Sequence, residues 1–181
     1  MIGVVEKKSC PLCGQQLGPE EIKVVPSTRF DDGWDVQCRM CGSSSVTMEA
    51  KLEIRGLPAG RRADLASWVC EQALHGRKPP TICSSEYQSR ERAHDYRINQ
   101  ILETLAPRSF SERLERVLEN LATLTPAPGE SFGLNEYGIY ACYATSVRQM
   151  HFNLNAIEEQ GWLRGIARSS RAGMASTPHE V

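Results

Sequence analysis

Two Cys-x-x-Cys pairs constrain this chain more than any other feature of its sequence. The pairs are Cys10–Cys13 and Cys38–Cys41, with 24 residues between them, and a glycine follows each pair. Two residues between cysteines let a tight turn aim both sulfurs at one ion, and the glycine permits the backbone conformation that such a turn needs. A segment this small has too little core to fold reliably without help. We therefore expect Cys10, Cys13, Cys38 and Cys41 to hold one structural metal ion.

The nature of the ligands narrows the choice of metal. Four thiolates suit Zn²⁺, and they also suit iron. The duplicated pattern favours one Zn²⁺ per chain, with iron and an unmetallated cluster as the alternatives. Four protein ligands leave no open position for a substrate or an activated water. The metal is therefore expected to stabilise the fold and not to take part in a reaction.

The residues around the two cysteine pairs have the alternating pattern of strands. Glu21–Pro26 and Trp34–Gln37 are predicted strands joined by a turn at 31–33, and Ser45–Ile54 is a further alternating run. Two cysteine knuckles on a small antiparallel sheet resemble a zinc ribbon, and the resemblance covers roughly residues 8–55. It implies that the four cysteines are the zinc ligands.

The middle of the chain has a helical pattern. One predicted helix contains Leu65–Gln72 and ends at His75–Gly76, and another runs over Ile98–Leu105 and ends before Pro107. The run Glu86–Arg97 mixes both charge signs and is interpreted as a solvated helix face. Residues 57–107 are therefore expected to form a helical linker region.

The order of elements after residue 108 resembles a winged helix. Ser109 and Glu112 form a capping box at the start of a helix over 109–124, and Ser146 and Gln149 form another at the start of a helix over 146–160, which Gly161 ends. The remaining expected elements are a strand at Ser131–Leu134, a short helix at Tyr137–Tyr143 and a strand at Trp162–Ala167. The return strand of the wing is missing or very short, which suggests a fragment with further domains downstream; a short natural C-terminus is the alternative.

These elements predict an α+β chain with three parts. Residues 1–56 are the expected zinc ribbon, 57–107 the helical linker region and 108–181 the winged-helix-like domain, truncated at the wing if the chain is a fragment. The whole layout resembles the N-terminal regions of poorly characterised multidomain bacterial proteins. That resemblance implies a non-enzymatic recognition module. The alternative is a regulatory or sensor segment of a larger effector enzyme whose catalytic domain lies downstream.

The helix over 146–160 occupies the position of a recognition helix. Four of its outward residues could contact DNA or RNA, namely Arg148, Gln149, His151 and Asn155. Phe152 would lie beside them on the outward face. Against nucleic acid, Glu158 and Glu159 follow on the same helix, and the formal net charge is −1 with no basic block. Both a protein partner and a nucleic acid therefore remain open, and a dimeric transcription regulator is a weaker alternative.

Catalytic motifs are not evident. The sequence has no phosphate-binding glycine loop and no His-Glu-x-x-His pattern. Of the remaining cysteines, Cys70 is expected on a different helix face from His75, Cys142 lies in an apolar stretch, and Cys83 is expected in a loop without a base nearby. We expect no enzymatic activity in this segment.

The N-terminus and the cysteine content bear on the compartment. No apolar run approaches the ~20 residues of a membrane span, and the basic Lys7 and Lys8 follow a very short apolar patch, which is the wrong order for a secretory signal. Seven cysteines without such a signal favour a reducing compartment. The expected location is the cytoplasm, without a membrane partner.

Overall fold

The computed structural model describes residues 8–28, 31–87, 94–125, 134 and 138–162, and this part of the chain has the α+β fold that the sequence predicted. The strands are β1 (Lys8–Ser9), β2 (Gln16–Leu17), β3 (Ile22–Pro26), β4 (Gly33–Cys38), β5 (Gly42–Thr47), β6 (Thr81–Cys83) and β7 (Asp95–Arg97). The helices are α1 (Met48–Gly56), α2 (Ala59–Leu74), α3 (Ile98–Gln100), the π-helix η1 (Ile101–Leu105), α4 (Phe110–Leu124) and α5 (Val147–Glu159).

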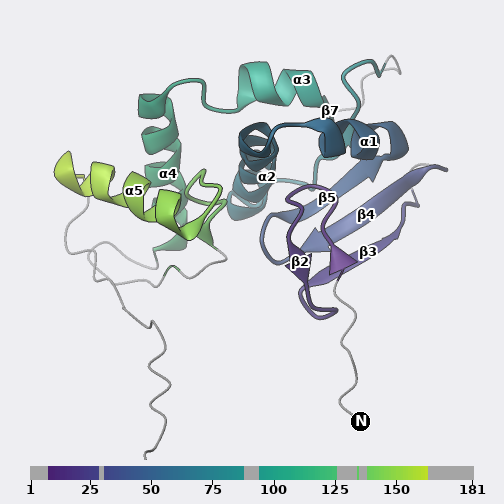
Figure 1. Ribbon diagram of the computed structural model, residues 1–181, viewed down its shortest axis with the longest axis horizontal. Helices are drawn as coiled ribbons and strands as arrows, with labels where there is room; N and C mark the ends of the chain where they lie inside the picture. The colour runs from purple at the N-terminus through teal and green to yellow at the C-terminus, as the bar shows by residue number, and fades with distance from the viewer. Residues whose placement is uncertain (1–7, 29–30, 88–93, 126–133, 135–137, 163–181) are drawn as a thin grey trace, which may run out of the picture.

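A five-stranded sheet in the order β3-β4-β5-β6-β7 forms one side of the molecule (Figure 1). Its first three strands are an antiparallel meander, and β3 and β4 confirm two of the predicted strands. β6 and β7 are parallel to β5 and to each other, with Val46 opposite Ile82 and Ile82 opposite Tyr96. The segment 57–107 thus adds two strands to the sheet, whereas the sequence predicted only helices there. A strand of three residues is too short to show a period of two.

The predicted strand Ser45–Ile54 is wrong beyond Thr47, where α1 begins. The Thr47 Oγ1 accepts a hydrogen bond from the Ala50 backbone N–H (3.3 Å) and caps the helix. Ala50 and Ile54 are buried and lie four residues apart, while Leu52 between them is exposed. A spacing of four residues fits one face of a strand and also one face of a helix, so the alternation had two interpretations. The capping threonine decides between them.

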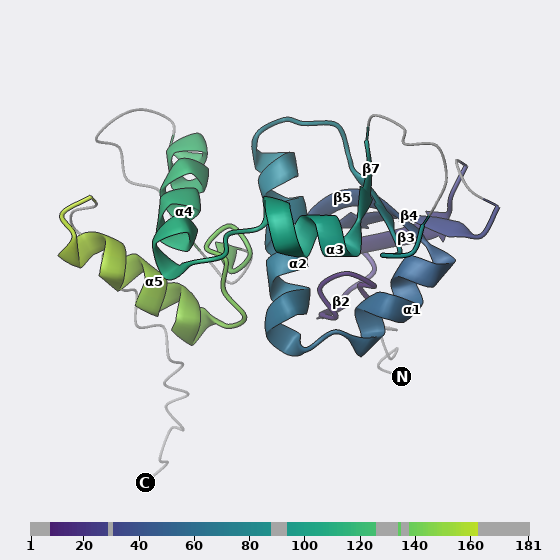
Figure 2. The same cartoon turned by 90° about the horizontal axis from the view of Figure 1, so that it is seen from above.

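α2 is the central wall of the molecule. It lies between the sheet on one side and α4 and α5 on the other (Figures 1 and 2). The helix expected around Leu65–Gln72 is confirmed, and it ends before Gly76, whose φ is +63°. Leu65 and Val69 are fully buried, and the ring of Trp68 packs edge-on against Tyr96 of β7 at 4.9 Å between centroids.

The charged run Glu86–Arg97 does not form the expected helix face where the structure describes it. Residues 95–97 are the strand β7, and residues 88–93 lie outside the described part of the chain. The helix expected over Ile98–Leu105 is confirmed as α3 followed by η1, and it ends before Pro107.

Both predicted capping serines begin their helices. The Ser109 Oγ accepts from the Glu112 N–H (3.1 Å), and the Glu112 carboxylate accepts from the backbone N–H of Arg108 (2.7 Å). The Ser146 Oγ accepts from the Gln149 N–H (3.2 Å) at the start of α5. In both cases the side chain at the third helical position reaches one residue further back than in the expected box: Glu112 accepts from the Arg108 N–H, and Gln149 accepts from the Thr145 N–H.

The winged-helix interpretation stays a prediction. The strands expected at Ser131–Leu134 and Trp162–Ala167 lie almost wholly outside the described residues. Residues 138–143 form a helical turn closed by the Cys142 N–H on the Gly138 carbonyl (3.1 Å), and Gly161 has the left-handed φ of +76° expected after α5. None of the helices in the described ranges is long and apolar enough to cross a membrane.

Gly42 and Gly60 give a matched test of how closely α2 packs against the turn between β4 and β5. Gly42 has a φ of +86°, and a Cβ there would stand 2.9 Å from the Ala73 Cβ of α2. Gly42→Ala should lower the free energy of unfolding by more than about 1–2 kcal/mol, the cost of a left-handed Ala before any clash. Gly60→Ala meets no atom within 4 Å and should leave stability unchanged or raise it by up to about 1 kcal/mol. Urea titration of both variants measures this; equal effects would contradict the packing.

Candidate metal centre

The four cysteines of the two knuckles converge on one point. Their Sγ atoms all lie within 4.8 Å of one another; Cys10 and Cys41 are 3.7 Å apart, and Cys13 and Cys38 are 3.9 Å apart. A tetrahedron of thiolates around Zn²⁺, with bonds of about 2.3 Å, has edges of about 3.8 Å. A disulfide would need about 2.05 Å. The cluster therefore has the donor atoms and the spacing of a tetrahedral metal site.

Each knuckle is held by a local turn that its glycine makes accessible. In the β1–β2 hairpin, the Gly14 N–H donates to the Cys10 carbonyl (2.9 Å), and Gly14 has a φ of +76°. In the β4–β5 turn, Cys38 is paired with Gly42, whose φ is +86°. Both glycines thus adopt the left-handed conformation that an L-residue with a side chain disfavours. The predicted role of the glycine after each pair is confirmed.

The cluster is closed to solvent. All four cysteines are buried, and Cys41 has no exposed surface. The four sulfurs hydrogen-bond to one another. The bonds that Cys38 makes with the other three sulfurs, that with Cys10 first, lower the pKa of Cys38, and a hydrogen bond with the Cys41 backbone N–H lowers it further. Hydrogen bonds with Cys10 and with Cys38 raise the pKa of Cys13. Four buried sulfurs that compete for protons in this way are well suited to share one cation.

α2 and its N-terminal turn cover the cluster. Ala73 packs against Gly42 of the second knuckle, and Arg62 lies against Gly14 of the first, with Nη1 3.1 Å from where a Cβ would stand. The Arg62 guanidinium also donates to the carbonyls of Ile54 (2.8 Å) and Arg55 (2.9 Å) at the end of α1. One arginine therefore joins the first knuckle to the end of α1 and the start of α2.

A tyrosine from the C-terminal part reaches the first knuckle. The Tyr140 hydroxyl donates to the Cys13 carbonyl (3.4 Å), and both residues are buried. Burial raises the pKa of Tyr140, with the nearby Cys13 adding to the effect. The hydroxyl therefore stays protonated and remains a donor. This contact places residues 138–144 directly against the metal knuckle.

A polar cluster, here called the α2–α4 clamp, fastens the C-terminal helices to α2; Glu71 and Tyr143 in it are buried, and its other members are half-buried. Glu71 is only 1% exposed, and its carboxylate accepts from Arg116 Nη1 (2.7 Å) and from the Tyr143 hydroxyl (2.8 Å). Arg113 Nη2 lies 3.1 Å from the Asp64 carboxylate. The clamp consists of Asp64, Glu71, Arg113, Arg116 and Tyr143. Because Glu71 is nearly inaccessible to water, its charge depends on these two partners.

Side chains of α4 and α5 hold the segment 138–144 in an unusual conformation. Tyr143 has a φ of +49°, which is rare for a residue with a bulky side chain. Its carbonyl accepts from Arg113 (3.1 Å), while the side-chain amides of Asn120 and Asn153 donate to the carbonyls of Ala141 (2.9 Å) and Cys142 (2.8 Å). These hydrogen bonds offset the cost of the strained turn.

The sequence did not predict the clamp, although a signal was present. Asp64 and Glu71 are seven residues apart, so they share one face of α2, and Arg113 and Arg116 are three apart on α4. Two stripes of opposite charge on neighbouring helices indicate a pairing. The partners, however, are 45 to 49 residues apart in the chain, and the sequence does not say which helices pack together.

The residues predicted to contact nucleic acid all lie on α5, but they differ in accessibility. Arg148 and His151 are exposed, Asn155 is half-buried, and Gln149 is half-buried with its Oε1 accepting from the Thr145 N–H (2.9 Å). Gln149 therefore serves first as a helix cap. Phe152 beside them is 61% exposed.

The three cysteines outside the cluster are buried. Cys83 was expected in a loop, and this is wrong: it lies in β6 and has no exposed surface. Burial raises the pKa of Cys70, Cys83 and Cys142 to about 12 in each case. These thiols are therefore protonated at neutral pH and poorly suited to act as nucleophiles.

Comparison of the chain with protein-family models, with curated proteins and with solved structures finds no match.

Tyr143→Phe tests the clamp. The change removes the hydroxyl that donates to Glu71 and leaves a buried carboxylate oxygen without that donor, so the free energy of unfolding should fall by about 1–3 kcal/mol. Tyr87→Phe is the control, because Tyr87 is half-buried and lies outside the clamp; a change within about 0.5 kcal/mol is expected. Urea unfolding followed by circular dichroism measures both. Equal stabilities of the two variants would show that the Glu71–Tyr143 bond contributes nothing.

Proposed function

We propose that this chain is a non-enzymatic recognition module that one structural Zn²⁺ stabilises. The observation that carries the proposal is the closed set of four cysteine sulfurs, all within 4.8 Å of one another and all buried. A catalytic zinc needs a position open to substrate or water, and a buried set of four thiolates offers none. The three remaining thiols are buried and protonated, which also disfavours covalent catalysis.

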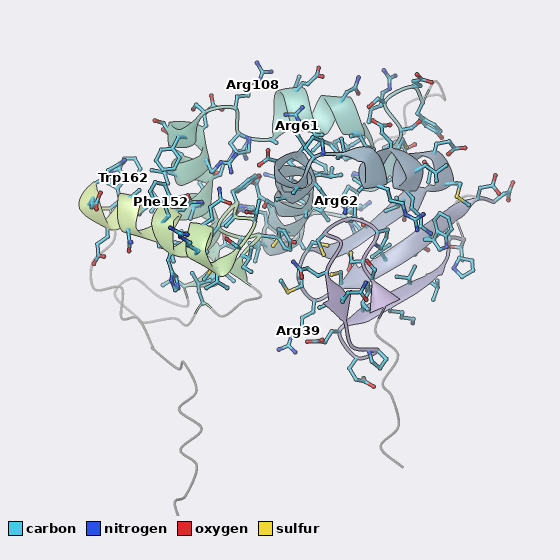
Figure 3. The ribbon with its side chains drawn as sticks, viewed as in Figure 1. Arg39, Arg61, Arg62, Arg108, Phe152 and Trp162 are labelled. Carbon is cyan, nitrogen blue, oxygen red and sulfur yellow. The ribbon has the colours of Figure 1, made fainter. Side chains whose placement is uncertain are left out.

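The recognition surface in this proposal is the exposed side of α5 with the adjoining end of α4. This region carries large apolar side chains that the fold leaves uncovered: Phe110 is 47%, Phe152 61% and Trp162 50% exposed. Figure 3 shows Phe152 on α5 and Trp162 just beyond the end of this helix, at the end of the molecule away from the sheet. Arg148 and His151 lie on the same helix and are exposed. Aromatic and arginine side chains together are typical of binding surfaces for proteins and for nucleic acids.

The metal assignment predicts about one zinc per chain. Elemental analysis should find zinc and no iron, and Cys38→Ser should lose the metal and unfold the N-terminal sheet, because the two knuckles have too little core of their own. Cys83→Ser is the matched control, since Cys83 is a buried cysteine outside the cluster. It should keep its zinc. A folded Cys38→Ser variant without metal would contradict the structural role.

The recognition role predicts binding without turnover. Binding of the zinc-loaded protein to duplex DNA, single-stranded DNA, RNA and a displayed peptide library should be measured across salt concentrations, with Phe152→Ala beside the wild type. We expect at least one class to bind and Phe152→Ala to weaken it about 5-fold or more. If no nucleic acid binds even at low salt, the partner is a protein. If the wild type and Phe152→Ala bind every class equally, this surface is not the recognition surface.

A further inference from the structure

A hollow of about 320 Å³ opens between the N-terminal ends of α4 and α5. This volume lies at the lower end of the range for small-molecule sites in proteins. The helices α4 and α5 lie on the opposite side of α2 from the sheet (Figure 2), and none of the four clustered cysteines lines the hollow. The lining residues are Arg108, Ser109, Phe110, Arg113, Gln149, Phe152 and Asn153.

One wall of the hollow is aromatic. The rings of Phe110 and Phe152 are 5.8 Å apart between centroids and tilted by 42°. Each helix contributes one ring, and both residues remain partly exposed, Phe110 at 47% and Phe152 at 61%. Phe152 is the more exposed of the two, so part of its apolar ring surface remains available beside Phe110. A flat ring of this kind is a surface on which another flat ring can stack.

The polar groups around the aromatic wall are mainly hydrogen-bond donors. The Gln149 Oε1 already accepts from Thr145, so its amide N–H₂ is the group left for a ligand. The Ser109 Oγ accepts from the Glu112 N–H, which leaves its O–H as a donor. Arg108 adds a guanidinium group, which only donates, whereas the Arg113 guanidinium already donates to the Tyr143 carbonyl and the Asp64 carboxylate. A ligand that pairs with these donors must carry hydrogen-bond acceptors.

The charge of the lining favours an anion. It includes two arginines and no carboxylate. Asp64 on α2 partly neutralises Arg113, while the Glu112 carboxylate, the nearest in sequence to Arg108, is hydrogen-bonded to the Arg108 backbone N–H. Arg108 is exposed on the connection that leads into α4 (Figure 3). Of the two arginines in the lining it is the exposed one, and it also borders a second hollow that Glu112, Glu115 and Glu119 line.

We propose that this hollow binds a nucleotide, with the base stacked on Phe152 and the phosphate at Arg108. The inference rests on the proposed recognition function and names the chemistry of its ligand. An acceptor-rich anion that carries a flat ring matches both the aromatic wall and the donor-rich rim, and one nucleotide is of the right size for the hollow. A free nucleotide and an unpaired nucleotide in a single strand share this chemistry. Paired bases inside a duplex do not, because their faces are covered by stacking.

Two probes distinguish a free nucleotide from an unpaired nucleotide in a single strand. Fluorescence anisotropy with labelled dT12 at 20 to 300 mM salt reports on single strands, and titration calorimetry with AMP and UMP reports on free nucleotides. Phe152→Ala should weaken binding by about 5- to 100-fold, the range for loss of one stacked base. Arg108→Gln should weaken it at every salt concentration and, for dT12, reduce the slope of log affinity against log salt by about 1.

The matched controls lie on α1, on the sheet side of α2. Leu52→Ala removes another highly exposed apolar side chain, and Arg55→Gln removes another exposed arginine. Both variants should bind like the wild type. Zinc content and circular dichroism of all four variants show whether the fold is intact, so that a lost interaction is not confused with a lost structure.

The outcomes distinguish this inference from the proposed function. Binding of AMP or UMP that depends on Phe152 and Arg108 supports a free nucleotide, and binding of dT12 alone supports a strand. No binding of any of these probes at 20 mM salt overturns the inference. Binding of duplex DNA or of an acidic peptide that Phe152→Ala leaves unchanged also overturns it, while the recognition function stands. Turnover of a bound nucleotide would instead contradict the non-enzymatic function and leave the site in place.

Discussion

The structure depends on bringing four sulfurs from two separate turns within 4.8 Å of one another. This convergence joins the β1–β2 hairpin to the β4–β5 turn, which no ladder of strand hydrogen bonds connects in the described residues. It also fixes the surface on which α2 packs, because Ala73 fits against Gly42 only while that residue has no side chain. A bound cation would supply what the small apolar core around the knuckles cannot, since four buried thiolates repel one another without it.

The influence of the metal knuckles extends to the other end of the molecule through α2. One face of this helix covers the cysteines, and the opposite face carries Asp64 and Glu71 of the α2–α4 clamp. Tyr140 gives a second connection, from residues 138–144 to the carbonyl of Cys13. The C-terminal helices are therefore fixed to the N-terminal part by directional polar contacts in addition to the apolar core that both parts share. Contacts of this kind hold one geometry, because a shift of an ångström breaks them.

Local and non-local determinants explain which features the sequence could predict. Each Cys-x-x-Cys turn with its glycine, and the capping residues Ser109 and Ser146, act over four residues or fewer, and these local features were predicted correctly. The convergence of the two turns spans 25 to 31 residues, and it was predicted only because the pattern occurs twice. The run Ser45–Ile54 was predicted wrongly beyond Thr47 because a spacing of four residues fits both the period of a strand and the period of a helix. β6 and β7 are strands only because β5 lies beside them, which the sequence does not show. The clamp depends on which helices meet. The aromatic wall likewise joins Phe110 to Phe152 across 42 residues of chain, a distance over which no local pattern extends.

The clamp and the hollow share Arg113, and this explains why a polar contact is useful at this position. A buried ion pair adds little net stability compared with well-packed apolar residues, so fixing geometry is the better account of Asp64 and Glu71. The Asp64–Arg113 pair sets where α4 lies against α2, and Arg113 also binds the Tyr143 carbonyl that precedes α5. One guanidinium therefore sets both helices whose N-terminal halves carry Phe110 and Phe152. An apolar contact would tolerate sliding of α4, and sliding would separate the two rings.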